Sequence, residues 1–136
     1  MTIAETIKER NPEATVERNL RIKRPQRKVA LPTLEGIYFE KVKEIVRLEA
    51  KGNYTFIHLV NNRKILVSKT LSEIENKLHH HPRFVRVHRS NTINLDLLIK
   101  YVRGKGGYVE MEDGTKITVS IARKQDFLST LERYFG

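Results

Sequence analysis

Short runs of bulky and β-branched residues, separated by turn residues, recur along most of this chain and restrict it to a mostly β fold. In one run, Tyr54 and Phe56 alternate with Thr55 and Ile57, which is the period of a strand with two unlike faces. The expected strands are 29–31, 36–39, 45–51, 54–60, 64–68, 84–87, 108–112 and 115–119. Because the connections between many of these runs are short, we expect antiparallel hairpins.

Two helices are expected beside the strands. Thr70 and Glu73 match a capping box, and apolar residues at helical spacing behind them predict a short helix over 71–78. Ser120 is expected to cap a C-terminal helix. The buried side of that helix is expected to carry Ile121, Phe127, Leu128, Leu131 and Tyr134 or Phe135.

Three further motifs are interpreted as turns or helix ends. Asp113-Gly114 suits a tight primed turn and predicts the clearest hairpin of the chain. The glycine-rich segment 103–107 lacks the strand-loop-helix context of a nucleotide-binding motif, so we expect a turn there. The run His79-His80-His81 has no further ligands at suitable spacing, which favours a solvated helix end over a metal site.

The composition limits the class of protein. At 136 residues, 39% of them hydrophobic, the chain suits one domain with its own core. It has no cysteine, which excludes disulfides and thiolate metal sites, and we expect neither a metal nor another cofactor. No apolar run approaches the roughly 18 residues of a membrane span, so we expect a cytoplasmic protein. Lys and Arg outnumber Asp and Glu by 26 to 16, giving a net charge of +10 that favours polyanionic partners.

The first 28 residues differ in composition from the rest. They contain few large apolar residues and end in a basic run without acids: Arg18, Arg21, Lys23, Arg24, Arg27 and Lys28. Low hydrophobicity predicts a flexible basic leader or linker over 1–28, followed by one folded domain over 29–136. A basic arm that lies along phosphates is the sharper alternative, and the two are compatible because disordered arms order on binding.

A polar cluster follows the apolar strand that begins at Phe84. His88, Arg89, Ser90 and Asn91 stand together at the end of that strand. A cation, a hydroxyl and an amide are the groups that bond phosphate oxygens and base edges. Because a strand end holds such a cluster in place yet open to a ligand, we interpret this corner as a contact surface.

Catalysis is not indicated by the same residues. Ser90, His88 and Asp96 supply the residue types of a hydrolytic triad, but no strained turn or oxyanion loop accompanies them. A magnesium-dependent nuclease needs clustered carboxylates, whereas Asp96, Asp113 and Asp126 fall in unconnected segments. We therefore expect a binding protein and not an enzyme.

Three connections carry side chains suited to nucleic acid. The candidate contact residues are Lys51 and Asn53 in the first, Arg89, Ser90 and Asn91 in the second, and Arg123 and Lys124 in the third. Arg suits guanine edges, Asn suits adenine edges, and Lys more often meets phosphate. Plainer alternatives stay open, with Asn53 as the residue of a left-handed turn and Arg123 as a solvated side chain.

Several motifs carry a resemblance to a known family. They are Leu48–Thr55 (LEAKGNYT), Ser68–Leu71, Phe84–Ser90, Ile93-Asn94, Gly106–Val109 and Val119-Ser120. In order and spacing they resemble the LytTR family, the DNA-binding domain of bacterial LytR/AlgR-type response regulators. The resemblance covers about 29–136, and the Phe84–Ser90 block followed by Ile-Asn is its most specific part.

The resemblance implies a fold and a mode of binding. The family fold is an elongated sandwich of small antiparallel sheets with short helices, and its loops enter successive major grooves of DNA. Carried onto this chain, the loop 51–53 makes one contact, Arg89 reaches the bases and Ser90 helps on the DNA backbone. His88 is expected to be a packed support residue.

The chain departs from the family pattern in two places. The family commonly has Arg one or two residues after the serine that corresponds to Ser120, whereas Ile121-Ala122 precede Arg123 here. Members usually carry an N-terminal receiver domain with a phosphorylatable aspartate, which 28 residues cannot hold. Either an effector domain cut from a longer protein or a stand-alone regulator fits, so a receiver domain or sensor-kinase pathway is an expected partner.

We therefore expect a sequence-specific double-stranded DNA-binding protein that regulates transcription, pairs on direct repeats as the family does, and forms a homodimer on DNA. The alternative is a basic RNA-binding or ribosome-associated module, in which Tyr54, Tyr101 and Tyr108 would stack on unpaired bases. A pure protein-interaction domain is a third class, and it predicts little salt-sensitive DNA binding.

Overall fold

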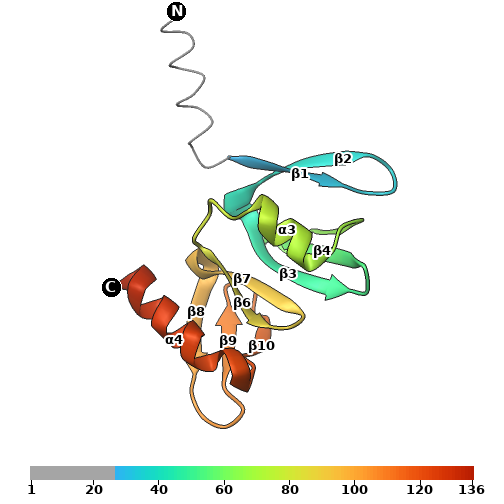
Figure 1. Cartoon of the computed structure of the whole chain (residues 1–136). Helices are drawn as coiled ribbons and strands as arrows, with labels where there is room; N and C mark the ends of the chain where they lie inside the picture. The colour runs from blue at the N-terminus through green and yellow to red at the C-terminus, as the bar shows by residue number, and fades with distance from the viewer. Residues whose placement is uncertain (1–26) are drawn as a thin grey trace, which may run out of the picture.

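The strands of the structure, a computed structural model that describes residues 27–136, form three small antiparallel sheets. Their bounds are β1 (Lys28–Pro32) and β2 (Ile37–Lys41) in the first sheet, β3 (Ile45–Lys51), β4 (Tyr54–Leu59), β5 (Lys64–Val67), β6 (Phe84–His88) and β7 (Asn91–Asn94) in the second, and β8 (Leu98–Val102), β9 (Tyr108–Met111) and β10 (Lys116–Thr118) in the third. The strand order is β5-β4-β3-β7-β6 in the second sheet and β10-β9-β8 in the third. Figure 1 shows the five-stranded sheet in the middle, with the β1–β2 sheet above it and the third sheet below.

One helix, α3 (Leu71–Lys77), and the 3-10 turns Val42–Glu44, Val60–Asn62 and Leu95–Leu97 connect strands in the described part of the chain. A second helix, α4 (Ile121–Phe135), follows the last strand. The capping box predicted at Thr70 is confirmed, because its hydroxyl accepts from the Glu73 N–H and the Glu73 carboxylate accepts from the Thr70 N–H. Within residues 27–136, no helix is long and apolar enough to cross a membrane.

The five-stranded sheet has a hydrophobic core on each face. The first core joins it to β1 and α3 and consists of Val29, Leu31, Val42, Ile45, Leu48, Ile57, Leu59, Ile65, Val67, Leu71, Ile74 and Leu78. The second core joins it to the third sheet and α4 and consists of Val46, Val87, Ile93, Leu95, Val109, Met111, Ile117, Val119 and Phe127. The central strand β3 contributes Leu48 to the first core and Val46 to the second, so it forms part of the wall of both.

The predicted fold class is confirmed, and every predicted strand occurs near its expected limits. The alternation along β4 is also confirmed, because Thr55 and Ile57 are buried while Tyr54 and Phe56 are half-buried on the other face. The leader predicted over 1–28 lies outside the described residues except for Arg27 and Lys28, and Lys28 already opens β1.

Strand β7 was not predicted, because its sequence Asn-Thr-Ile-Asn is too polar to look like a buried strand. Thr92 and Asn94 are nevertheless buried, with 1% and 0% of their surface exposed. The Asn94 amide donates to the Ile45 carbonyl at 2.8 Å, and its carbonyl oxygen accepts from the Asp96 N–H. The Thr92 hydroxyl donates to Glu75, so each buried polar side chain of this interior strand has a hydrogen-bond partner.

Two predictions about connections are only partly right. The hairpin predicted around Asp113-Gly114 is confirmed, because β9 pairs antiparallel with β10, but the connection spans 112–115 and is not the predicted two-residue turn. Within it the Asp113 carboxylate accepts from the Thr115 N–H, and Gly114 takes a φ of 87°. The histidine run is not wholly solvated either. His79 and His80 are exposed, but His81 is only 5% exposed and its ring packs edge-on against Phe84.

Helix α4 is confirmed and begins directly after Ser120, which takes the predicted N-cap position, but part of its predicted buried side is wrong. The Ser120 hydroxyl makes no capping hydrogen bond. Phe127, Leu131 and Tyr134 pack on the second core. Three other apolar residues point outward, with exposed fractions of 86% for Ile121, 41% for Leu128 and 59% for Phe135. The helical period separates these two sets, because residues seven apart fall on one side of a helix.

Candidate nucleic-acid interface

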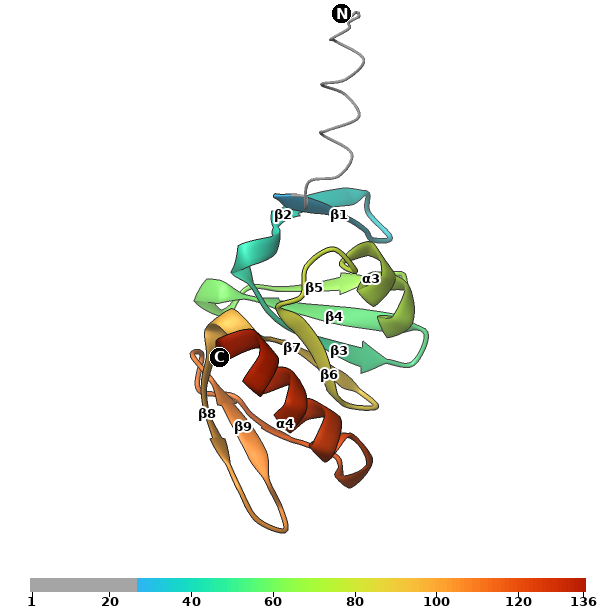
Figure 2. The ribbon, with the colours of Figure 1, turned by 60° about the vertical axis from the view of Figure 1, so that its left-hand side comes forward.

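The three connections that carry the predicted contact residues lie next to one another on one side of the molecule, as Figures 1 and 2 show. The Ala50 N–H donates to the Ser90 carbonyl at 2.8 Å, which joins the β3–β4 turn to the β6–β7 turn. The Ser120 N–H donates to the Val87 carbonyl at 2.9 Å, which joins the start of α4 to β6. We name this region, formed by residues 51–53, 89–91 and 120–124, the loop edge.

The β3–β4 turn presents two exposed polar side chains. Lys51 pairs with Tyr54 in the strand register, which leaves Gly52 and Asn53 as the turn itself. Gly52 takes the left-handed φ of 60°, and Asn53 does not have a positive φ. The alternative that Asn53 serves only as the left-handed residue is therefore wrong. Its amide is exposed at the tip of a hairpin that both cores support.

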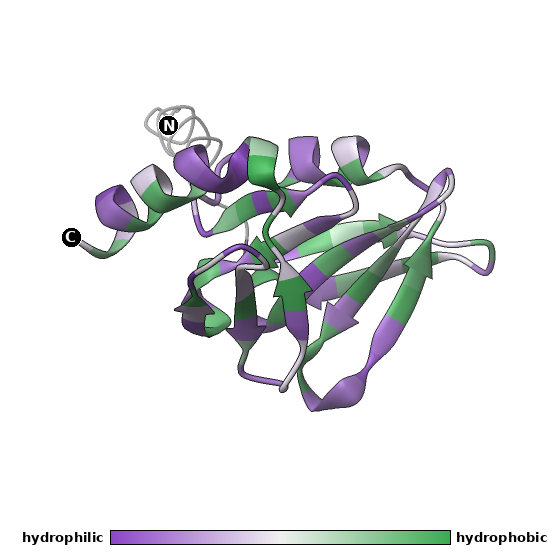
Figure 3. Cartoon of the chain, turned by 90° about the horizontal axis from the view of Figure 1, so that it is seen from below, coloured by the Kyte–Doolittle hydropathy of each residue, from purple (hydrophilic) through white to green (hydrophobic). Residues whose placement is uncertain are grey.

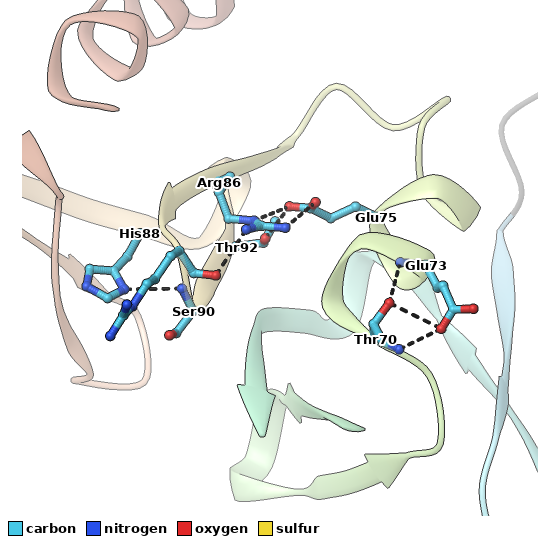
Figure 4. Close-up of polar contacts among 8 residues, drawn as sticks. Thr70, Glu73, Glu75, Arg86, His88, Ser90 and Thr92 are labelled. Atoms are coloured by element: carbon cyan, nitrogen blue, oxygen red, sulfur yellow. Dashed lines mark hydrogen bonds and ion pairs between the residues drawn. The ribbon is translucent and has the colours of Figure 1, made fainter. Parts of the chain in front are cut away.

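A hydrogen-bond network holds the β6–β7 turn in position, as Figure 4 shows. The Arg86 guanidinium donates to both oxygens of Glu75 on α3, at 2.8 and 2.7 Å. It also donates to the Arg89 carbonyl at 3.0 Å, and Glu75 accepts a further bond from the Thr92 hydroxyl. A two-pronged arginine–carboxylate contact fixes orientation as well as distance. The backbone that carries Arg89 is thereby fastened to α3.

The charge state of Glu75 follows from the same contacts. Burial by itself would raise the pKa of this carboxyl group. The hydrogen bonds from Arg86 and Thr92, together with the charges of Arg86 and Arg123, outweigh that effect and lower the pKa below its ordinary value. Glu75 is therefore ionised at neutral pH and can hold Arg86 as an ion pair.

The side chain of Arg89 makes no hydrogen bond to the other residues of this network. Its side chain is exposed, and no acidic group within residues 27–136 forms an ion pair with it. The next residue, Ser90, is half-buried, and its N–H donates to Nδ1 of His88 at 3.2 Å. The half-buried His88 ring thus supports the turn from beneath, which agrees with the packed role expected for it.

The third connection separates its two cations. Arg123 is half-buried and close enough to Glu75 to contribute to the lowering of its pKa. Lys124 instead lies with Ile121 and Leu128 along a hollow on the outer side of α4. In the described residues, neither cation forms a salt bridge. The structure brings Arg123 toward the β6–β7 turn and places Lys124 on a different face.

Asn91 belongs to a polar hollow beside the loop edge and not to its tip. It pairs with Glu49 across the sheet, and its carbonyl oxygen accepts from Nη1 of Arg47 at 3.0 Å. The hollow has a volume of about 290 Å³ and is lined by Arg47, Glu49, His88, Asn91, Thr115, Lys116, Ile117 and Thr118. The sequence analysis did not single out Arg47 or Lys116. Alternation along the strand could not identify Arg47, because the register shift between Ile45 and Arg47 interrupts it and leaves Val46 and Leu48 in different cores.

Several cations elsewhere in the described residues are paired with acids, whereas the cations of the loop edge are not. Ion pairs occupy Arg47, Arg63, Arg83, Arg86 and Lys100. Lys51, Arg89 and Arg123 have no acidic partner among residues 27–136, and Asn53 adds an exposed amide in the same turn as Lys51. Cations without acidic partners and an open amide are groups that can bind phosphates and base edges.

Comparisons with known proteins agree with this arrangement. Residues 35–132 match the family described as the LytTr DNA-binding domain. The solved LytTr DNA-binding domain of a protein named as a methyl-accepting/DNA response regulator from Bacillus cereus has a similar fold, with a TM-score of 0.67. The two sequences are 23% identical, and the match covers 78% of this chain and 97% of that one. No curated protein matches the chain. The chain belongs to the LytTR family of DNA-binding domains, whose function is DNA binding in the regulation of transcription.

Proposed function

We propose that this domain binds double-stranded DNA in a sequence-specific manner by inserting the loop edge into the major groove, and that it thereby regulates bacterial transcription. One observation carries the proposal. Three connections far apart in sequence are joined by backbone hydrogen bonds, Ala50 to Ser90 and Ser120 to Val87, and they present cations that no acid within residues 27–136 neutralises. Rigidly held loops of this kind suit base reading, because the scaffold fixes their spacing.

The side chains of the loop edge take different roles in this proposal. Arg89 reads a guanine edge, and Asn53 reads an adenine edge, as their donor and acceptor patterns allow. Lys51, Ser90 and Arg123 meet phosphates and set the orientation of the domain on the duplex. Two more residues lie at the margin. Asn91 shapes the turn through its bond with Arg47, and Lys124 meets DNA only where the duplex passes the outer side of α4.

The wider setting is proposed from the family. Two copies would occupy neighbouring direct repeats and pair as a homodimer on DNA. The input would come from a receiver domain or a sensor-kinase pathway, since the Bacillus cereus domain is part of a response regulator. The net charge of +10 would speed the approach to the polyanionic duplex.

The alternative of an RNA-binding module is not favoured by any contact in the described residues. It needs exposed aromatic rings that stack on unpaired bases. Tyr101 packs edge-on against Phe127 with ring centres 5.8 Å apart, and its hydroxyl is buried. Tyr54 and Tyr108 are half-buried in strands, and Lys116 lies over the Tyr108 ring at 5.8 Å.

The proposal is tested by selecting sites from random duplexes and then titrating the selected duplex with Arg89→Ala. Loss of the base contact is expected to weaken binding by about 1–3 kcal/mol and to relax the preference at one base position. The matched control is Arg133→Ala, which removes the same charge from an exposed position near the end of α4. The proposal fails if Arg89→Ala binds selected and scrambled duplexes as the parent does, or if single-stranded RNA competes better than duplex DNA.

A further inference from the structure

The outer face of α4 carries an apolar stripe that the fold does not use. Ile121, Leu128 and Phe135 are spaced seven residues apart and therefore lie on one side of the helix. Their exposed fractions are 86%, 41% and 59%. Figure 2 shows α4 on the outside of the molecule, and Figure 3 shows hydrophobic and hydrophilic residues alternating along it.

A hollow of about 450 Å³ runs along this stripe. It is lined by Ile121, Lys124, Gln125, Leu128, Ser129 and Glu132. The opposite side of α4 is already occupied, since Phe127, Leu131 and Tyr134 pack on the second core and the Tyr134 hydroxyl donates to Asp96 at 2.6 Å. The helix is thus anchored on one side and exposes on the other an open hollow, in which Ile121 and Leu128 lie among polar residues.

One cation and one anion line the hollow, at equal distances along the helix on either side of Leu128. Lys124 precedes Leu128 by four residues and Glu132 follows it by four, so one turn of helix separates each charge from the centre. A second α4 packed antiparallel to the first at Leu128 would bring Lys124 near Glu132 of the partner subunit. The two-fold symmetry would make the same contact a second time, between Glu132 and Lys124 of the partner subunit. It would also place Ile121 against Phe135 of the partner subunit. A parallel second helix would bring like charges together.

We infer that the outer face of α4 binds a second copy of this chain in an antiparallel, two-fold arrangement centred on Leu128. The pattern is self-complementary, which is the requirement of an interface in which the same surface meets itself. The helix dipoles also oppose one another in the antiparallel arrangement and favour it. One helix per copy makes a smaller interface than the standard of about 1,600 Å², so the dimer is reversible and depends on concentration.

This interface concerns the free protein and does not depend on the proposed mode of DNA reading. A two-fold pair differs from the head-to-tail arrangement that direct repeats impose. The α4 pair therefore forms away from such repeats, and binding to a single site does not require it. The two proposals can fail separately, because one is measured without DNA.

The test is sedimentation of the full 136-residue chain over a range of concentrations, without DNA. Leu128→Glu places two carboxylates against each other at the two-fold axis and is expected to weaken dimerisation by more than about tenfold. The matched control is Phe39→Glu, which changes an equally apolar, 63% exposed residue on β2 and is expected to leave dimerisation unchanged. Far-ultraviolet circular dichroism verifies that both variants are folded.

A charge exchange tests the orientation of the pair. Lys124→Glu and Glu132→Lys are each expected to weaken the dimer, and the double variant is expected to restore it. These variants are compared only by sedimentation, because Lys124 also belongs to the loop edge. A parent chain that is monomeric at every concentration overturns the inference, and so does a double variant weaker than both single ones.

Discussion

At the scale of the residue, Glu75 on α3 fixes the β6–β7 turn, which carries Arg89. It holds Arg86 with two hydrogen bonds, and Arg86 in turn holds the carbonyl of Arg89. The carboxylate is half-buried, so its charge would be costly without these donors. Its hydrogen bonds keep the pKa low and keep the chain of contacts intact.

Replacing this carboxylate is expected to change stability in a pH-dependent way. The folded pKa of Glu75 lies below its ordinary value of 4.5, so its contribution is present above that value and is lost as the pH falls through the folded pKa. Glu75→Gln is expected to lower the free energy of unfolding by about 1–3 kcal/mol at neutral pH. The difference from the parent should vanish in acid, as measured by urea unfolding at a series of pH values.

The control for this experiment is Glu35→Gln, which neutralises an exposed carboxylate in the β1–β2 turn and is expected to have little effect. A difference between Glu75→Gln and the parent that stays constant from neutral pH into acid would contradict the role assigned to the ion pair.

The sequence could predict residue types at the contact turn but not their partners. Arg86 and Arg89 are three residues apart and chemically identical, and the sequence analysis favoured Arg89 through the family resemblance. Only the structure shows that Arg86 is bound to Glu75, which lies eleven residues before it on another element. Similarly, the sequence could not decide between Gly52 and Asn53 for the left-handed position, because both residue types tolerate it.

At the scale of the element, α3 depends on its capping box. The Thr70 hydroxyl and the Glu73 carboxylate satisfy N–H groups that would otherwise lack partners at the start of this short helix. Thr70→Ala is expected to lower the free energy of unfolding by about 0.5–2 kcal/mol. Thermal unfolding measures the loss, with Ser72→Ala, an exposed position inside the same helix, as the control. A loss at Ser72 as large as that at Thr70 would show that capping is not the cause.

Helix α4 shows what local pattern can and cannot predict. Apolar residues at helical spacing were sufficient to place the helix, but they lie on two sides of it. The side that carries Phe127 is buried only because the second core is there to receive it, and that core is assembled from strands distant in sequence. A single helix contains no information about which of two apolar sides meets the protein and which meets solvent.

At the scale of the whole molecule, charge predicts a strong dependence of DNA binding on salt. If about six phosphates are neutralised, the logarithm of the binding constant should fall with the logarithm of salt concentration at a slope of about −5. Fluorescence anisotropy with the selected duplex measures this slope. A scrambled duplex of equal length should bind more weakly and remain salt-sensitive. Binding that does not change with salt would contradict a phosphate-centred interface and would favour a protein-interaction domain.

Local sequence patterns could not predict how the three sheets pack against one another. Hairpins such as β3–β4 can be predicted from their short connections. The pairing of β3 with β7 cannot, because it places Arg47 beside Ile93 although β4, β5, α3 and β6 separate the two strands in the sequence. That pairing depends on polar residues of β7 that only become satisfied once the sheet has formed. The family resemblance predicted the sandwich of sheets, and the alternation of residues predicted its individual strands.

Strand β3 contributes side chains to the cores on both faces of its sheet and is bonded to a neighbour along each edge. Detaching β3 would expose both hydrophobic cores to solvent, so the two cores are expected to unfold together. Unfolding is then an all-or-none event. A substitution that weakens the packing of β1 on the first core is therefore expected to destabilise the loop edge as well.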